Sequence, residues 1–155
     1  MSQEEPRAIR PMDAHLGFGL RVAANHLTWS FTRRLQVAGV TPPEWVAMRL
    51  ILDAGSLAPS HLARAMATTR GATTKLVDKL VRRGMIGRCA GPQDRRVQAL
   101  FLTDAGRAFA LSVADLAERN DEAFFAPLAP DERETLRDLL ARLNDHANGA
   151  PPVPA

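Results

Sequence analysis

The sequence predicts a mainly α-helical domain that carries one small β-hairpin. Three observations lead to this fold class. Apolar residues recur every three or four positions along most of the chain, residues that start and end helices bound these stretches, and the periodicity changes only in residues 85–102, where two short apolar runs flank a turn. A chain of 155 residues is long enough to bury the core of one such domain.

The predicted domain spans residues 13–147. Its first helix covers residues 13–38, where apolar side chains follow helical spacing, and Gly39 ends it. Residues 1–12 and 148–155 are polar or rich in proline, with too few apolar groups to offset the entropy lost on ordering. We expect both terminal segments to be disordered.

A second helix is predicted to begin after Thr41. Pro42 and Pro43 suit its first turn, and Glu44 stands three residues after Thr41, so that the two can form a capping box. The apolar stretch that follows stops at Gly55. We therefore expect a helix between these bounds.

Two further helices lie close together in the sequence. Pro59 opens a short helix over residues 61–67, and a turn at Thr69 leads to a longer helix over residues 70–83, which Gly84 ends. Two helices joined by so short a turn predict a helix-turn-helix unit, whose second helix is the one that enters the major groove of DNA. We call that second helix the recognition helix.

The hairpin follows the recognition helix directly. Residues 85–89 and 97–102 are predicted strands, joined by the turn AGPQDRR with its glycine, proline and charged residues. A hairpin with a basic tip at this place is a β-wing, so residues 42–102 are predicted to form a winged helix-turn-helix lobe. Thr103 then caps the first of two closing helices within residues 104–147.

The positive charge of the chain is concentrated in one segment. Residues 64–96 hold nine basic and two acidic side chains, a net charge of +7, whereas the whole chain carries +3 and the remainder therefore −4. Such a segment suits a polyanion, because each neutralised phosphate releases condensed counterions. A solvated helix face is the alternative explanation of the charge taken alone.

Two stretches carry a more specific pattern: LVDKLVRRGMI at residues 76–86 and DRRVQALFLTDAGR at residues 94–107. They contain four features in a fixed order: a helix that ends in a basic pair and glycine, a D-x-R wing tip, an apolar strand and the motif L-T-x-x-G-R. This order resembles the multiple antibiotic resistance regulator (MarR) family, and the match in element order covers roughly residues 13–147. The resemblance implies a DNA-binding transcriptional regulator.

The resemblance also implies an interlaced-helix homodimer. Residues 13–38 and 104–147 would interlace with those of a second copy and hold two winged lobes over successive major grooves of double-stranded DNA. Such a dimer requires a pseudopalindromic operator. The apolar stripes of these helices agree with a dimer, because one chain of this length offers no second layer to cover them all.

The recognition helix supplies most candidate DNA contacts. We expect Thr69 to cap it, and Arg70, Thr73 and Thr74 to contact bases, since arginine reads guanine bidentately and threonine can contact a thymine methyl. Capping and phosphate binding are the alternative for the threonines. Expected phosphate contacts are Lys75, Lys79, Arg82, Ser60 and His61. A plain cap is the alternative for Ser60.

The wing tip holds a second set of candidates. By resemblance, Arg96 enters the minor groove, Asp94 fixes its guanidinium with a charge-assisted hydrogen bond, and Arg95 faces a phosphate. Asp78, an acid on an otherwise basic helix, resembles a family position that braces the wing arginine. A surface acid that relieves repulsion between lysines is the alternative.

Many members of the family release DNA when a small aromatic anion binds between the dimerisation helices and the winged lobe. Candidates for such a pocket here are His26, Trp29, Arg33, Trp45 and Arg49. Trp45 and Arg49 are four residues apart and share a helix face, which sets an apolar wall beside a cation. The alternative is that Trp45 belongs to the core and Arg49 is a solvated charge.

Other functions find little support. The chain has no glycine-rich phosphate loop, no G-x-S-x-G elbow and no paired-carboxylate signature, so we expect no enzyme. Its four histidines lack the spacing of metal ligands, so no metal or cofactor is expected, and we expect Cys89 to be a packed thiol. Without a secretion signal or an apolar run near the ~20 residues of a membrane span, the chain is expected to be cytoplasmic.

Two functions are therefore compared. The first is a repressor that occupies a pseudopalindromic operator and is released by a small aromatic or anionic ligand. The second is a dimeric winged-helix module that binds proteins without sequence-specific DNA binding. The charge of residues 64–96 and the D-x-R wing tip favour the first.

Overall fold

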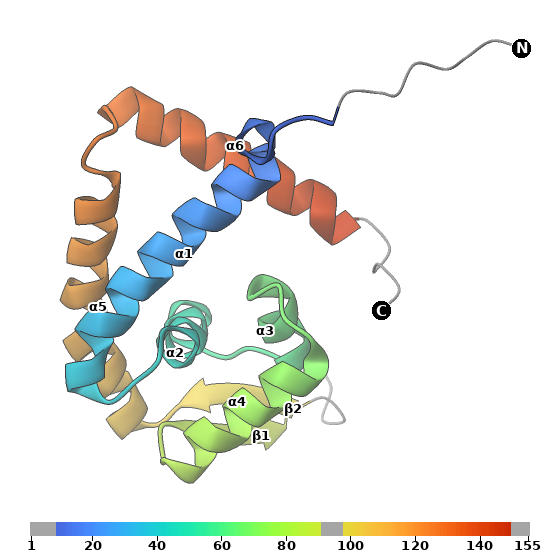
Figure 1. Cartoon of the computed structure of the whole chain (residues 1–155). Coiled ribbons are helices and arrows are strands. Elements are labelled where there is room, and N and C mark those ends of the chain that lie inside the picture. Colours follow the sequence, from blue (N-terminus) through green and yellow to red (C-terminus); the bar gives the residue numbers. More distant parts are fainter. Residues whose placement is uncertain (1–8, 91–97, 150–155) are drawn as a thin grey trace, which may run out of the picture.

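The protein is a mainly helical domain with one two-stranded hairpin, which confirms the predicted fold class (Figure 1). The computed structural model describes residues 9–90 and 98–149. Most of the two terminal segments predicted to be disordered lies outside these ranges. The elements are α1 (Leu16–Leu35), α2 (Pro42–Ala54), α3 (Pro59–Ala65), α4 (Arg70–Arg82), β1 (Ile86–Ala90), β2 (Gln98–Leu102), α5 (Asp104–Phe125) and α6 (Pro130–Gly149).

Local capping contacts start three helices where the sequence predicts them. At the start of α2, Glu44 accepts the backbone N–H of Thr41 at 2.8 Å within a capping box. The hydroxyl oxygens of Thr69 and Thr103 accept a backbone N–H from the first turns of α4 and α5, at 3.2 Å and 3.0 Å. Each contact satisfies a donor that the first turn of a helix leaves unpaired.

The first helix is shorter than predicted at both ends. It begins at Leu16 because His15 has an extended backbone, and its last turn tightens into the 3-10 segment Gln36–Ala38. Gly39 then adopts the left-handed conformation, with φ at +67°, that turns the chain toward α2.

The core lies between α2, α3, α4 and the hairpin, and the end of α1 and the first half of α5 close it. Leu57, between α2 and α3, exchanges two backbone hydrogen bonds with Leu100 of β2, at 3.0 Å and 2.9 Å, which anchors the hairpin to the lobe. The largest fully buried apolar side chains are Leu35, Met48, Ile51, Leu62, Leu80, Ile86 and Leu100.

The hairpin pairs its strands in antiparallel register, with Ile86 opposite Leu102. The first strand begins one residue later than predicted, and the predicted first residue of the second strand, Val97, lies outside the described residues. The start of α5 lies so close to the hairpin that a Cβ on Gly106 would collide with the carbonyl oxygen of Met85. Glycine in the D-A-G-R stretch is therefore required by close packing of α5.

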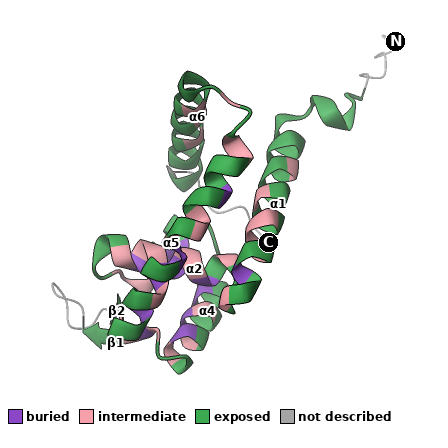
Figure 2. Ribbon diagram, turned by 90° about the vertical axis from the view of Figure 1, so that its left-hand side faces the viewer, coloured by how far each residue is buried: buried purple, intermediate pink, exposed green. Residues whose placement is uncertain are grey.

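Helices α1 and α5 lie side by side, joined by a hydrogen bond of 2.7 Å from the Ser30 hydroxyl to Oδ1 of the buried Asn120 (Figure 1). Helix α6 stands apart from the winged lobe, and it and the first half of α1 are mostly exposed (Figure 2). Exposed apolar side chains there include Leu16, 92 % exposed, and Leu143, 58 % exposed. None of the helices in residues 9–90 and 98–149 has the length and apolar character of a membrane span.

Candidate nucleic-acid interface

The recognition helix α4 presents its first two turns on the surface of the winged lobe. Arg70, Gly71, Thr74 and Lys75 are all exposed there. The Thr74 hydroxyl donates to the carbonyl oxygen of Arg70 at 2.9 Å, which leaves its lone pairs and its methyl group free for a ligand. The predicted contacts of these side chains with bases and phosphates are therefore sterically open.

Thr73 does not share this exposure. Its side chain is 2 % exposed, and its hydroxyl donates to the carbonyl oxygen of Thr69 at 3.0 Å and lies 2.8 Å from the hydroxyl of Thr68. The prediction that Thr73 contacts bases is wrong, because packing against the core of the lobe turns this side chain inward.

The cationic side chains of α4 differ in whether they form an ion pair with another described residue. Lys75 and Arg82 are exposed and form no ion pair with any residue that the structure describes. Lys79 differs, because its Nζ lies 2.8 Å from Oε1 of Glu44, a side chain that is 1 % exposed. Lys79 thus has an internal carboxylate partner although its side chain is 52 % exposed, and its predicted phosphate contact stays a prediction.

The start of α3 lies beside this surface. Ala58 is the N-cap of α3 and Pro59 its first residue, so Ser60 lies within the first turn and the capping alternative for Ser60 is wrong. Ser60 and His61 are both exposed. Their predicted phosphate contacts remain predictions.

Asp78 links the recognition helix to the wing. Its Oδ1 accepts a hydrogen bond of 2.5 Å from Nη2 of Arg88 on β1, and both side chains are partly exposed. The brace expected between Asp78 and the wing arginine Arg96 lies outside the described residues, and the partner that the structure shows is an arginine in the body of the hairpin. Sequence reasoning missed Arg88, because a pair ten residues apart across a turn has no local signal. The predicted tip contacts Asp94, Arg95 and Arg96 lie outside the described residues.

The predicted ligand pocket is divided by the structure. Trp29 and Arg33 stack, with the guanidinium carbon 5.1 Å from the ring centre, and they line a hollow of about 340 Å³ together with Ser30 and Arg34. His26 is exposed on the same helix but does not line the hollow. Ser30 and Arg34 were missed, although each directly follows a predicted pocket residue and their spacing of four on the predicted helix gives a signal for a shared face.

Trp45 and Arg49 do not line this hollow, and their part in a ligand pocket stays a prediction. Trp45 packs edge to face on Phe31, with ring centres 5.4 Å apart, and is partly buried against the core. Arg49 pairs with Asp53 one turn further along α2, with Nε 2.9 Å from Oδ1. The helix face that these two residues share is taken up by intramolecular contacts.

Cys89 is exposed on β1, so the prediction of a packed thiol is wrong: the edge of the two-stranded hairpin is not covered at this point. Within residues 9–90 and 98–149, no three side chains of histidine, cysteine, aspartate or glutamate are placed to share a metal ion.

An exposed basic helix that follows a short helix and is braced by a hairpin defines a winged helix-turn-helix protein. The MarR family model matches residues 40–98. A proposed transcriptional regulatory protein for the hcr operon of Thauera aromatica is 35% identical over 133 residues, which are 85% of this chain and 80% of that protein. The chain therefore belongs to the MarR family of transcriptional regulators.

Solved structures agree with this assignment. A proposed transcriptional regulator of Pseudomonas aeruginosa is 34% identical, with a TM-score of 0.77, over 86% of this chain and 99% of that one. A variant of MarR from Escherichia coli, complexed with operator DNA, has a TM-score of 0.74 at 24% identity and covers 83% of this chain and 92% of that one. The second likeness supports the fold alone.

Proposed function

We propose that the protein is a sequence-specific DNA-binding repressor that acts in the cytoplasm as a homodimer on a pseudopalindromic operator. The observation that carries this proposal is the exposed first half of α4, where Arg70, Thr74 and Lys75 reach solvent and the two cations form no ion pair with any residue that the structure describes. With α4 in the major groove, Arg70 reads a guanine and Thr74 a neighbouring base, while Lys75 binds a phosphate.

The wing adds contacts in the adjacent minor groove. The pair of Asp78 and Arg88 holds β1 against α4, so the groove-binding helix and the hairpin move as one body. Arg96 at the tip then enters the minor groove, with Asp94 orienting its guanidinium and Arg95 on a phosphate. Base contacts from α4 specify the sequence, and wing contacts fix the register.

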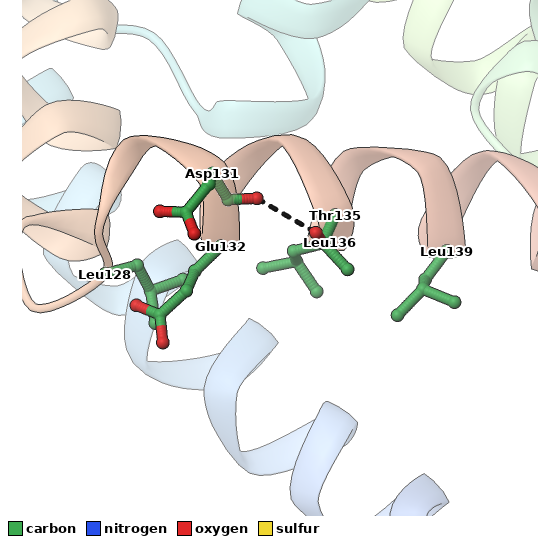
Figure 3. Close-up of a pocket in the computed structure, with 6 residues that line it drawn as sticks. All are labelled: Leu128, Asp131, Glu132, Thr135, Leu136 and Leu139. Atoms are coloured by element: carbon green, nitrogen blue, oxygen red, sulfur yellow. Dashed lines mark hydrogen bonds between the residues drawn. The ribbon is translucent and has the colours of Figure 1, made fainter.

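A second copy of the chain is proposed to cover the apolar surfaces of α1 and α6. A hollow of about 350 Å³ lies along the first half of α6. The side chains of Leu136 and Leu139 on α6, and of Leu128 just before it, point to the same side of the helix and make most of its lining apolar (Figure 3). Leu16 and Leu143 extend the exposed apolar surface of these two helices. An interlaced dimer would bury these groups and place two recognition helices about one turn of DNA apart.

The effector is proposed to be a small aromatic anion that binds beside Trp29. The ring of Trp29 provides a stacking surface, and Arg33 and Arg34 provide two cations beside it without a carboxylate partner among the described residues. Benzoate is a suitable probe, with quenching of tryptophan fluorescence as the signal. Arg33→Met should weaken benzoate binding, whereas the control Arg49→Met should not.

The test of DNA binding is selection of duplexes from a random library, followed by titration of the enriched site at several salt concentrations. A pseudopalindrome should emerge, and affinity should fall by about 0.9 log units per log unit of salt for each phosphate contact. Arg70→Ala should relax the preference at one position of each half-site, while the control Arg119→Ala on α5 leaves binding unchanged. If no sequence is enriched, the dimeric protein-interaction module replaces this proposal.

Repression is tested separately, by placing the selected site across a promoter. Transcription in vitro should fall as the protein is added and recover when an effector is present. A rise in transcription on addition of the protein would make it an activator.

A further inference from the structure

A buried carboxylate at the start of α2 contacts the recognition helix. Among the described residues, Glu44 is the one buried side chain with a formal charge. The Thr41 backbone N–H donates to its Oε2 at 2.8 Å, Lys79 Nζ lies 2.8 Å from Oε1, and Arg83 Nη1 lies 3.4 Å from Oε2. Burial raises the pKa of this carboxyl, but hydrogen bonds from Lys79 and Thr41 outweigh burial and hold the pKa below its ordinary value.

Arg83 extends the contact to the corner between α1 and α2. Its Nη2 donates to the carbonyl oxygen of Gly39 at 3.1 Å while Nη1 faces Glu44. Lys79 and Arg83 are four residues apart at the end of α4, so they project from the same side of the helix. The C-terminal end of α4 is thereby tied to two points of this corner.

A capping box alone does not require this arrangement. The carboxylate of a capping box needs only one oxygen, for the N-cap backbone N–H. Here both oxygens of a buried carboxylate face cations whose side chains are partly exposed, 52 % for Lys79 and 32 % for Arg83. In place of a buried charge, apolar side chains of similar size often stabilise a protein as well or better. Ion pairs with defined partners fix the direction of a helix, which apolar contacts do less strictly.

We propose that Glu44, Lys79 and Arg83 form a lock that sets the pose of the recognition helix. Lys79 then supports DNA binding by positioning α4 and does not contact a phosphate. The inference rests on the proposed DNA-binding function and adds to it the residues that hold the reading helix in place. Glu44 is a positioning residue that lies inside the lobe.

The lock predicts a distinctive pattern of DNA binding. When it is broken, α4 is correctly placed for only part of the time, and the apparent Kd rises by the inverse of that fraction. The complex that forms still contains the same phosphate contacts, so the dependence of affinity on salt does not change. Loss of one phosphate contact makes that dependence shallower by about 0.9 log units per log unit of salt.

Four variants of the full chain separate these cases. Glu44→Gln keeps the size of the side chain and an acceptor for Thr41, and Lys79→Met keeps the apolar stem. Two controls are matched by helix: Asp53→Asn removes an exposed carboxylate from α2, and Lys75→Met removes an exposed cation from α4. Operator affinity is measured at several salt concentrations, at a temperature at which unfolding curves show each variant to be folded.

We expect Glu44→Gln and Lys79→Met each to weaken operator binding by about tenfold or more, with the salt dependence of the wild type. The double variant should bind about as weakly as the weaker single variant, because both substitutions break the same lock. Asp53→Asn should bind as the wild type does. Lys75→Met should show the shallower salt dependence of a lost phosphate contact.

A shallower salt dependence for Lys79→Met would make Lys79 a phosphate contact and overturn the proposal. An affinity of Glu44→Gln equal to the wild type, with only a lower Tm, would overturn it as well. If Glu44→Gln does not fold, Arg83→Met provides the same comparison, because it leaves the capping box and the Lys79 pair in place. A wild-type protein with no affinity for any duplex refutes the proposed function and the lock together, which separates that failure from the others.

Discussion

Replacing Gly71 with alanine is expected to stabilise the protein and weaken its DNA binding. Gly71 is the second residue of α4, and a Cβ built on it would meet nothing within 4 Å. The fold therefore does not need glycine at this position, although glycine in a helix costs about 0.5–1 kcal/mol relative to alanine. In the proposed complex, close approach of the first turn of α4 to DNA would account for the missing side chain.

The two effects have different magnitudes. Gly71→Ala should raise the free energy of unfolding by about 0.5–1 kcal/mol, which corresponds to roughly 1–4 °C in Tm for a domain of this size. In the groove, the new methyl group displaces the helix from contacts made by Arg70 and Thr74, and loss of one base contact costs about 1–3 kcal/mol, or roughly five- to 150-fold in Kd. Thermal unfolding of the free protein measures the gain in stability, and titration of the operator measures the loss of affinity.

Ala105→Gly is the matched control. Ala105 is the exposed second residue of α5, so this variant should lose about the stability that Gly71→Ala gains, with no change in operator affinity. If Gly71→Ala has a higher Tm and binds the operator as tightly as the wild type, Gly71 does not face the groove. The docking of α4 by its first turn would then be refuted.

Three other perturbations test contacts around α4 and the hairpin. The pKa of Glu44 is lowered in the folded state, so the stability that the ionised carboxylate contributes is complete above the unfolded pKa of about 4.3 and is lost as the pH falls through the folded pKa. In Glu44→Gln, the free energy of unfolding should therefore fall less steeply with decreasing pH in this acid range. Arg88→Met should weaken operator binding, because it removes the ion pair that holds β1 against α4. That pair is partly exposed, so the free energy of unfolding measured in urea should fall by at most about 1 kcal/mol. An unchanged operator affinity would contradict the role of the Arg88–Asp78 pair as a brace. Gly106→Ala should cost more than about 1 kcal/mol, because the Cβ would collide with Met85; a wild-type midpoint in urea would contradict this packing.

The order of the elements and the starts of several helices were predictable from the sequence. Thr41 with Glu44, Thr69 and Thr103 start helices, and Gly39 ends the segment that includes α1. These signals act through backbone groups three or four residues away, so a short stretch of sequence contains both partners. The change of periodicity after Gly84 and the turn AGPQDRR predicted the hairpin and its place after α4.

The candidate site was predictable in part. Arg70, Thr74 and Lys75 are exposed on the first turns of α4, as the predicted DNA contacts require. Asp78 was expected to brace the wing, but its partner Arg88 comes from the other side of a turn, where no periodicity points to it. The brace depends on how the hairpin folds back against the helix.

Only the tertiary structure decided which side chains face inward. Thr73 turns into the lobe, Lys79 reaches the buried Glu44, and Trp45 packs on Phe31 of a different helix. The spacing of residues along one helix defines its faces, but it does not say which neighbour covers each face. That choice depends on burial and ion pairing between segments far apart in the chain, because those energies exist only once α1, α2 and α4 have packed together.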